Sequence, residues 1–149
     1  MDSDLTLFLE LSAHLTGFSV VELQGTGMGE TYLDAAATGT PGEWRGFLER
    51  AARVLREGGG DEARTHALIA RELFPQALFG GLAQNATSMW YSGQWPPTVD
   101  ASGANLATVT NVSAQAYVQG LMWMAAHTHP PGAKQPGFGS WARLPPSAQ

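Results

Sequence analysis

Apolar residues recur at helical spacing from the start of the chain, at Leu5, Phe8, Leu9 and Leu15. Gly17 follows this pattern, and glycine is the usual residue at a helix end. Ser19 and Glu22 have the spacing of a capping box, in which each side chain accepts a hydrogen bond from the other residue's backbone N–H. These signals predict one helix up to Gly17 and a second helix from Ser19 that continues to Gly39.

The next two helices are predicted from their caps and from one apolar stripe. Thr40 is the expected cap of a third helix, with Pro41 at its first position and Glu43 completing a second capping box. The core-facing stripe of that helix comprises Trp44, Phe47, Leu48, Ala51, Val54 and Leu55. A run of three glycines ends it, and Asp61 is the expected cap of a fourth helix that continues to Leu73.

The rest of the chain is less regular. Pro75 is expected to open a fifth helix, and Ser113 to cap a last one, with a long Pro- and Gly-marked loop over 92–111 between them. The prolines that follow predict an extended tail over 130–149. We therefore expect residues 1–149 to form an all-α protein, a single helical domain of about six helices with a long loop and a proline-rich C-terminal tail.

The composition is poor in charge. Hydrophobic residues make up 44% of the chain and charged residues only 14%, whereas soluble domains carry about 25% charged residues. A surface that binds a partner would explain the shortage, because the cores of interfaces are depleted in Lys, Glu and Asp. A compact domain rich in alanine and glycine would explain it equally well.

Charge and hydropathy also argue against several classes of function. The net charge is -5, and most of the few arginines lie among acidic residues between Arg45 and Arg64, which argues against nucleic-acid binding. No apolar run approaches the ~18 residues that a membrane-spanning helix needs. No signal peptide is visible, since Asp2 and Asp4 stand where a basic segment would be expected.

Few residues are candidates for chemistry. The chain has no cysteine, which excludes disulfides, thiolate metal sites and cysteine nucleophiles. Glycines 25, 27 and 29 resemble a phosphate-binding loop, but such a loop follows a strand and here a helical pattern precedes it. His127 and His129 lack the third ligand that a metal site requires, with His14 and His66 far away in sequence. We expect no catalytic residue, no cofactor and no metal in this chain.

Aromatic residues are the better candidates for function, because tryptophan and tyrosine dominate the binding energy of many interfaces. Core packing is expected to take about half of them, and those on the loop and the tail are expected to anchor a partner. The residues predicted for a partner interface are Trp90, Tyr91, Trp95, Tyr117, Trp123, Pro136, Gly137, Phe138 and Trp141.

Two segments carry a family resemblance. Residues Phe8–Gly17 read Phe-Leu-Glu-Leu-Ser-Ala-His-Leu-Thr-Gly, and a Trp-Tyr-x-Gly segment at 90–93 precedes a loop, a helix and a Gln-Pro-Gly-Phe segment at 135–138, with Trp141 nearby. Both segments resemble the small subunit of membrane-bound FAD-dependent sugar and polyol dehydrogenases, the sorbitol dehydrogenase small-subunit family. The motifs are structural in type, and the middle of the chain matches only in its helical character.

The resemblance implies a non-catalytic, chaperone-like accessory subunit in the periplasm. Its partner would be a large catalytic subunit of the glucose-methanol-choline type that holds FAD, and a multihaem cytochrome c subunit often completes such complexes. This chain lacks the twin-arginine signal of the family and the cysteine that some members carry before the Pro-Gly-Phe motif. A helical scaffold for another complex, or a free-standing helical enzyme that uses His127 or His129, remains as an alternative.

Overall fold

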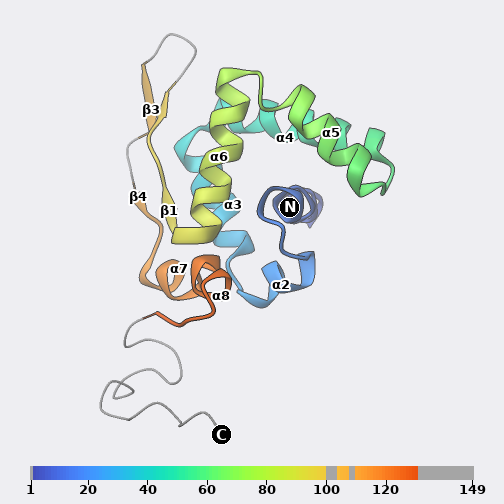
Figure 1. Ribbon diagram of the computed structural model, residues 1–149. Coiled ribbons are helices and arrows are strands. Elements are labelled where there is room, and N and C mark those ends of the chain that lie inside the picture. The colour runs from blue at the N-terminus through green and yellow to red at the C-terminus, as the bar shows by residue number, and fades with distance from the viewer. Residues whose placement is uncertain (1, 100–103, 108–109, 131–149) are drawn as a thin grey trace, which may run out of the picture.

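The computed structural model describes residues 2–99, 104–107 and 110–130, and within them the protein is predominantly helical (Figure 1). This confirms the all-α class. The helices are α1 (Asp2–Thr16), α2 (Val20–Gly25), α3 (Gly29–Gly39), α4 (Pro41–Gly58), α5 (Glu62–Glu72), α6 (Ala77–Ser92), α7 (Ala114–Gln119) and α8 (Leu121–Ala125). The predicted tail lies outside the described residues, apart from Pro130.

Three of the predicted helix boundaries are confirmed by their local geometry. Gly17 follows α1 with a φ of 79°, a left-handed conformation that suits glycine. Ser19 and Glu22 form the predicted capping box at α2, with the Ser19 backbone N–H donating to Glu22 Oε2 at 2.8 Å. Asp61 caps α5 by accepting a hydrogen bond from the backbone N–H of Arg64 at 2.8 Å.

The predicted second helix is in fact two helices, α2 and α3. Gly27 between them has a φ of 68°, which breaks the helical path. The hydroxyl of Thr26 donates to the carbonyl of Leu23 at 2.7 Å and accepts from the backbone N–H of Met28 at 3.1 Å. A threonine hydroxyl that bonds nearby backbone groups competes with the helical hydrogen bonds, and this local competition favours the break.

The capping box predicted at Thr40 is absent. Thr40 ends α3 and precedes α4, so that one residue joins the two helices. Its hydroxyl donates backwards to the carbonyl of Ala36 at 3.1 Å and makes no cap for α4. Pro41 does occupy the first turn of α4, as predicted.

The region after α6 contains more structure than a loop. β1 (Gln94–Trp95) pairs antiparallel with β4 (Thr110–Asn111), and β2 (Thr98–Val99) pairs antiparallel with β3 (Asn105–Ala107). Strands of two or three residues are too short to show the alternation that predicts a strand. The predicted last helix is also divided, because Gly120 leaves the helical conformation between α7 and α8.

The core forms around α1, which Figure 1 shows end-on with α4 and α5 above it, α6 to one side and α2 below. Aromatic rings fill the space between these helices. Phe8 of α1 stacks on Trp90 of α6 with ring centroids 5.9 Å apart, and Tyr32 of α3 meets the same indole edge-on at 4.8 Å. Burial raises the pKa of Tyr32 to about 12, so this phenol is neutral at physiological pH.

Two hydrogen bonds join α1 to the end of α6. The indole N–H of Trp90 donates to Ser12 Oγ at 2.8 Å, and both side chains are buried. The phenol of Tyr91 donates to the backbone carbonyl of Thr16 at 2.9 Å. A buried polar group left without a partner costs about 1–3 kcal/mol, and these bonds therefore select one alignment of the two helices.

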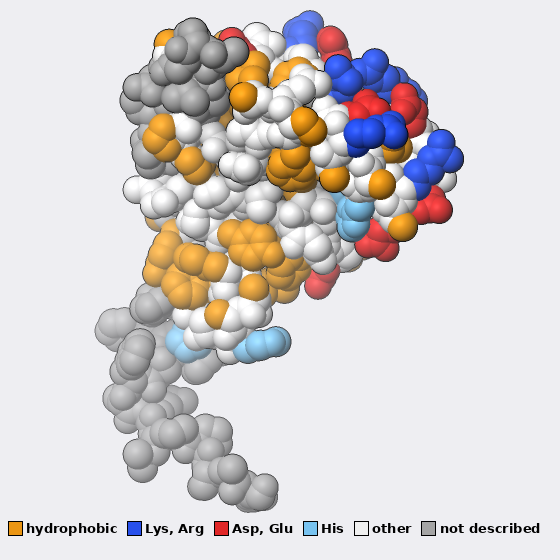
Figure 2. Space-filling view, turned by 45° about the horizontal axis from the view of Figure 1, so that its top comes forward, with side chains coloured by type: hydrophobic (Ala, Val, Ile, Leu, Met, Phe, Trp, Pro, Cys, Tyr) orange, Lys and Arg blue, Asp and Glu red, His pale blue; other side chains and the backbone are white. Residues whose placement is uncertain are grey.

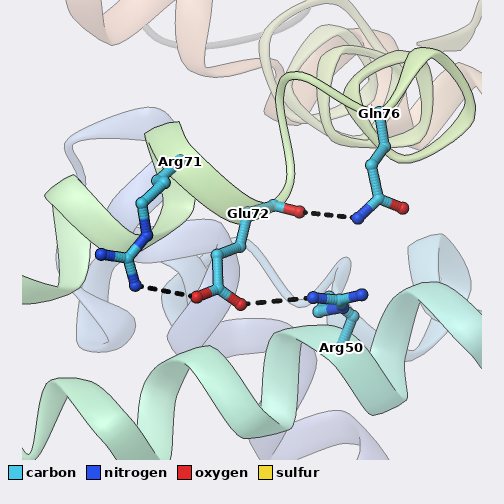
Figure 3. A network of polar contacts seen from close by, with 4 residues as sticks. All are labelled: Arg50, Arg71, Glu72 and Gln76. Carbon is cyan, nitrogen blue, oxygen red and sulfur yellow. Dashed lines mark hydrogen bonds and ion pairs between the residues drawn. The ribbon is translucent and has the colours of Figure 1, made fainter.

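Polar contacts also connect α4, α5 and the beginning of α6 (Figure 3). Glu72 accepts from Arg50 of α4 at 3.3 Å and from its neighbour Arg71 at 3.0 Å, while Gln76 donates to the Glu72 backbone carbonyl at 3.2 Å. The hydrogen bond from Arg71, followed by the one from Arg50, holds the pKa of Glu72 below its usual value. The Arg50 and Glu72 side chains are 29% and 19% exposed, and an ion pair so close to the surface contributes little stability.

We predict that Ser12→Ala lowers the free energy of unfolding by about 1–3 kcal/mol, because the Trp90 indole N–H would lose its only protein acceptor in a buried site. Urea denaturation followed by circular dichroism measures the change. Ser3→Ala is the matched control, since Ser3 is exposed on the same helix. Equal stability of the two variants would contradict the importance of the Ser12 bond.

Candidate partner-binding surface

Two of the residues predicted to anchor a partner lie in the chain's own core. Trp90 is 1% exposed and Trp95 is 3% exposed. Trp90 faces α1 and α3, and the ring of Trp95 meets the edge of Trp44 with centroids 5.9 Å apart. Their prediction as interface residues was therefore wrong, because both indoles are already covered by this chain.

Tyr91 has an intermediate position. Its ring is partly buried against Phe18, with centroids 6.1 Å apart, and its hydroxyl is bonded to the Thr16 carbonyl. These contacts serve the fold. Tyr91 therefore holds α6 against α1, and only part of its ring is exposed.

Tyr117 and Trp123 do lie at the surface, on α7 and α8. Their rings pack edge to face with centroids 5.3 Å apart, and the Trp123 indole N–H donates to the Tyr117 backbone carbonyl at 2.8 Å. Tyr117 is 43% exposed and Met124 is 46% exposed. Together with the half-buried Met122, these four residues define what we call the α7–α8 surface. Figure 2 shows hydrophobic side chains gathered at this end of the molecule.

Two glycines bring the α7–α8 surface close against α6. Gly93 has a φ of 73°, and a Cβ placed there would lie 2.7 Å from the carbonyl carbon of Ala116. A Cβ on Gly120 would lie 2.6 Å from the carbonyl oxygen of Tyr91. Only glycine permits these approaches, so the backbone itself positions α7 and α8 on the end of α6.

The two segments that carry the family resemblance meet in space. Ser12 and Thr16 of the first segment accept the hydrogen bonds of Trp90 and Tyr91 of the second, and Gly93 completes the contact with α7. Each distinctive residue of the Trp-Tyr-x-Gly pattern thus has a structural role. The remaining predicted interface residues, Pro136, Gly137, Phe138 and Trp141, lie outside the described residues.

Charge is distributed very unevenly around the molecule. Between Leu73 and Pro130 the sequence contains a single charged residue, Asp100, which lies outside the described residues. All arginines of the described residues are on α4 and α5, and Figure 2 shows the blue basic side chains at the upper right of the molecule, apart from the hydrophobic side chains at the lower left. The described residues of α6, α7 and α8 therefore contribute no Lys, Arg, Asp or Glu side chain to the surface, and we call the part of the surface that they form the uncharged face. The long segment with a single charged residue can be read from the sequence. The overall percentage of charged residues does not show it, because it averages over the whole chain.

His127 and His129 lie in and after the turn that follows α8. His127 is exposed in a left-handed turn with a φ of 51°, and His129 is half-buried with its ring nitrogen 3.3 Å from the Pro130 carbonyl oxygen. Residues 25–29 connect two helices, so the strand that a phosphate-binding loop requires does not precede them. Across the described ranges, no three histidine or acidic side chains are placed to hold a metal ion.

Two surface pockets lie against α4. One, of about 330 Å³, lies over α4 and α6 and is lined by Arg50, Arg53, Arg56 and Phe79. Another, of about 430 Å³, lies between α1, α3 and α4 beside Trp44 and Leu48. Neither pocket is lined by histidine or serine, and neither adjoins the α7–α8 surface.

The structure also brings together His14 and His66, which sequence reasoning treated as unrelated. Their rings pack edge to face across α1 and α5, with centroids 5.1 Å apart. No local motif predicts this contact, because it depends on how two helices dock.

Fold and surface together define the chain as a small helical protein with one uncharged, partly apolar face. No helix within the described ranges combines the length and the apolar character needed to cross a membrane. Comparisons with protein-family models, with curated proteins and with solved structures find no match to the chain.

We predict that Gly93→Ala destabilises the protein more than Gly27→Ala does. Both glycines have a positive φ, and alanine costs about 1–2 kcal/mol in that conformation. Only Gly93 has backbone atoms within contact of the added methyl group, which adds about 1–3 kcal/mol of overpacking. Chemical denaturation of both variants measures the difference, and equal losses would contradict a tight α6–α7 contact.

Proposed function

We propose that this chain is a non-catalytic small subunit of an FAD-dependent dehydrogenase complex of the glucose-methanol-choline type. In this proposal it binds the large flavoprotein subunit, stabilises it and assists its folding and export to the periplasm. The complex would oxidise a sugar, a polyol or another alcohol, and the substrate pocket would belong to the large subunit.

The uncharged face carries the proposal that this chain binds a protein. Burying a charged group against a partner is costly unless the charge is paired, and so the centres of interfaces are depleted in charge. Here the described residues from Leu73 to Pro130 contain no Lys, Arg, Asp or Glu at all. Tyr117 and Met124 add exposed apolar area to the same face, beside the half-buried Trp123. A face of this kind is suited to burial in a permanent complex.

The family assignment rests on the two resembling segments. Their contact through Ser12, Thr16, Trp90 and Tyr91 supports the view that they belong to one structural unit. That unit lies directly beside the α7–α8 surface, to which Gly93 and Gly120 join it. The resemblance therefore concerns the residues that position the proposed interface.

The cofactors of the complex would belong to other chains. FAD would be held by the large subunit, and a multihaem cytochrome c subunit would receive the electrons where the complex contains one. The small subunit would contribute binding energy alone.

A helical binding module of a different complex is the second candidate. The uncharged face favours it equally, since that face indicates burial without identifying the partner. The identity of the co-purifying protein distinguishes the two.

We predict that affinity purification of the chain from its native cells recovers a flavoprotein of several hundred residues. Absorbance of the eluate should show a flavin band, which should be absent when the chain is purified alone. Co-expression with that flavoprotein should raise the soluble yield of both. Recovery of a stable partner without flavin would exclude the dehydrogenase complex and favour the second candidate.

We predict that Tyr117→Ala weakens the complex by about 2–4 kcal/mol, as expected for a central aromatic residue of an interface. Phe74→Ala is the matched control, because Phe74 is equally exposed, at 43%, but lies between α5 and α6 near the charged helices. Titration of each variant against the immobilised partner measures the affinity. Equal affinity of the two variants would place the interface elsewhere.

The same titration tests the predicted role of the tail. Phe138→Ala and Trp141→Ala should each weaken the complex by about 2–4 kcal/mol while leaving the helical circular-dichroism signal unchanged. Loss of helicity in these variants would instead assign both residues to the core of this chain.

A further inference from the structure

The contact between His14 and His66 has a property that no other contact between described residues shares. It joins two imidazole rings, and two protonated imidazole rings in contact would repel each other. His14 is half-buried on α1, and His66 is exposed on α5. With ring centroids 5.1 Å apart and planes at 86°, the two rings pack well when both are neutral.

The surroundings of His14 determine the balance of charge at this contact. Burial, and secondly the neighbouring His66, lower the pKa of His14, while Glu62 and Glu10 act in the opposite direction. Each glutamate lies one helical turn before a histidine, Glu10 before His14 on α1 and Glu62 before His66 on α5. The carboxylates therefore act against the repulsion between two protonated rings.

Helix α5 depends on a small number of anchors. Its buried residues are Thr65, Leu68 and Ile69, and it packs mainly against α4. Its contact with α1 is smaller, and the His14–His66 ring contact is part of it. A change at this contact therefore acts on a helix whose attachment to α1 is limited.

We propose that the His14–His66 contact makes the docking of α5 on α1 sensitive to pH. While His14 is uncharged, the two rings pack together and α5 is held against α1. When His14 takes up a proton in acid, its charge is repelled by any charge on the His66 ring, the contact weakens, and α5 separates from α1 more often. This inference concerns the isolated chain and does not rest on the proposed function.

The sign of the effect follows from the lowered pKa of His14. The unfolded chain, with an ordinary histidine pKa of 6.5, takes up the proton before the folded chain does. The contribution of His14 to the free energy of unfolding is therefore fully present well above pH 6.5. It is lost as the pH falls through the pKa of His14 in the folded chain. The carboxylates of Glu22 and Glu72, whose pKa values are lowered from 4.5, lose their contribution only in more acidic solution. The two effects occupy different pH ranges.

Nuclear magnetic resonance of the full-length chain tests the proposal directly. The His14 ring signals should titrate with a midpoint below 6.5 in the unaltered chain. The midpoint should rise in His66→Gln, which removes the neighbouring positive charge, and fall in Glu62→Gln, which removes a negative one. Amide exchange in α5, corrected for its intrinsic pH dependence, should accelerate between pH 7.5 and pH 5.5 and should do so less in His66→Gln.

Two controls separate this contact from general acid effects. His127→Asn alters an exposed histidine in a left-handed turn that asparagine tolerates, and it should leave the α5 response unchanged. His66 is exposed, so His66→Gln should fold normally even if changes at His14 do not. An α5 exchange response that is the same in His66→Gln and in the unaltered chain would overturn the proposal.

Discussion

The hydrogen bond from the Trp90 indole to Ser12 is the interaction on which the arrangement of the molecule depends. It fixes the rotation of α6 relative to α1, because only one alignment satisfies both buried polar groups. Phe8 stacks on the same indole and Tyr32 meets it edge-on. The end of α6 is thereby fixed in space, and every element that follows it in the chain starts from that position.

Together with α6, the helices that follow its end form the uncharged face. Gly93 turns the backbone toward β1 and allows α7 to approach closely, and Gly120 allows α8 to begin against the carbonyl of Tyr91. The side chains placed there are polar but uncharged, or apolar, whereas α4 and α5 carry dense charge of both signs. This separation leaves one side of the protein suited to water and the other to burial. The opposing ends of α6 illustrate the contrast, with Glu72 and its arginines before one end and Tyr117 beside the other.

Local sequence signals predicted the start of a helix correctly where a single side chain caps it. Ser19, Asp61 and Ser113 cap helices because their side chains reach a backbone N–H within the same turn. Prediction failed where two local options compete. Thr40 could bond forward to α4 or backward to α3, and packing selected the backward bond. The aromatic residues show the same limit, since Trp95 and Trp123 both lie near helix ends but only one is buried.

The sequence by itself determined the helical class, most helix ends, the lack of cysteine chemistry and the shortage of charge. Each of these depends only on composition or on contacts within one helical turn. Tertiary structure decided which aromatic rings are buried, where the uncharged residues gather and which histidines touch. Those outcomes depend on pairs of residues far apart in the chain, such as Ser12 with Trp90 or His14 with His66. The spacing of apolar residues along the chain does not predict such pairs, because they form only when helices dock and exclude the water between them.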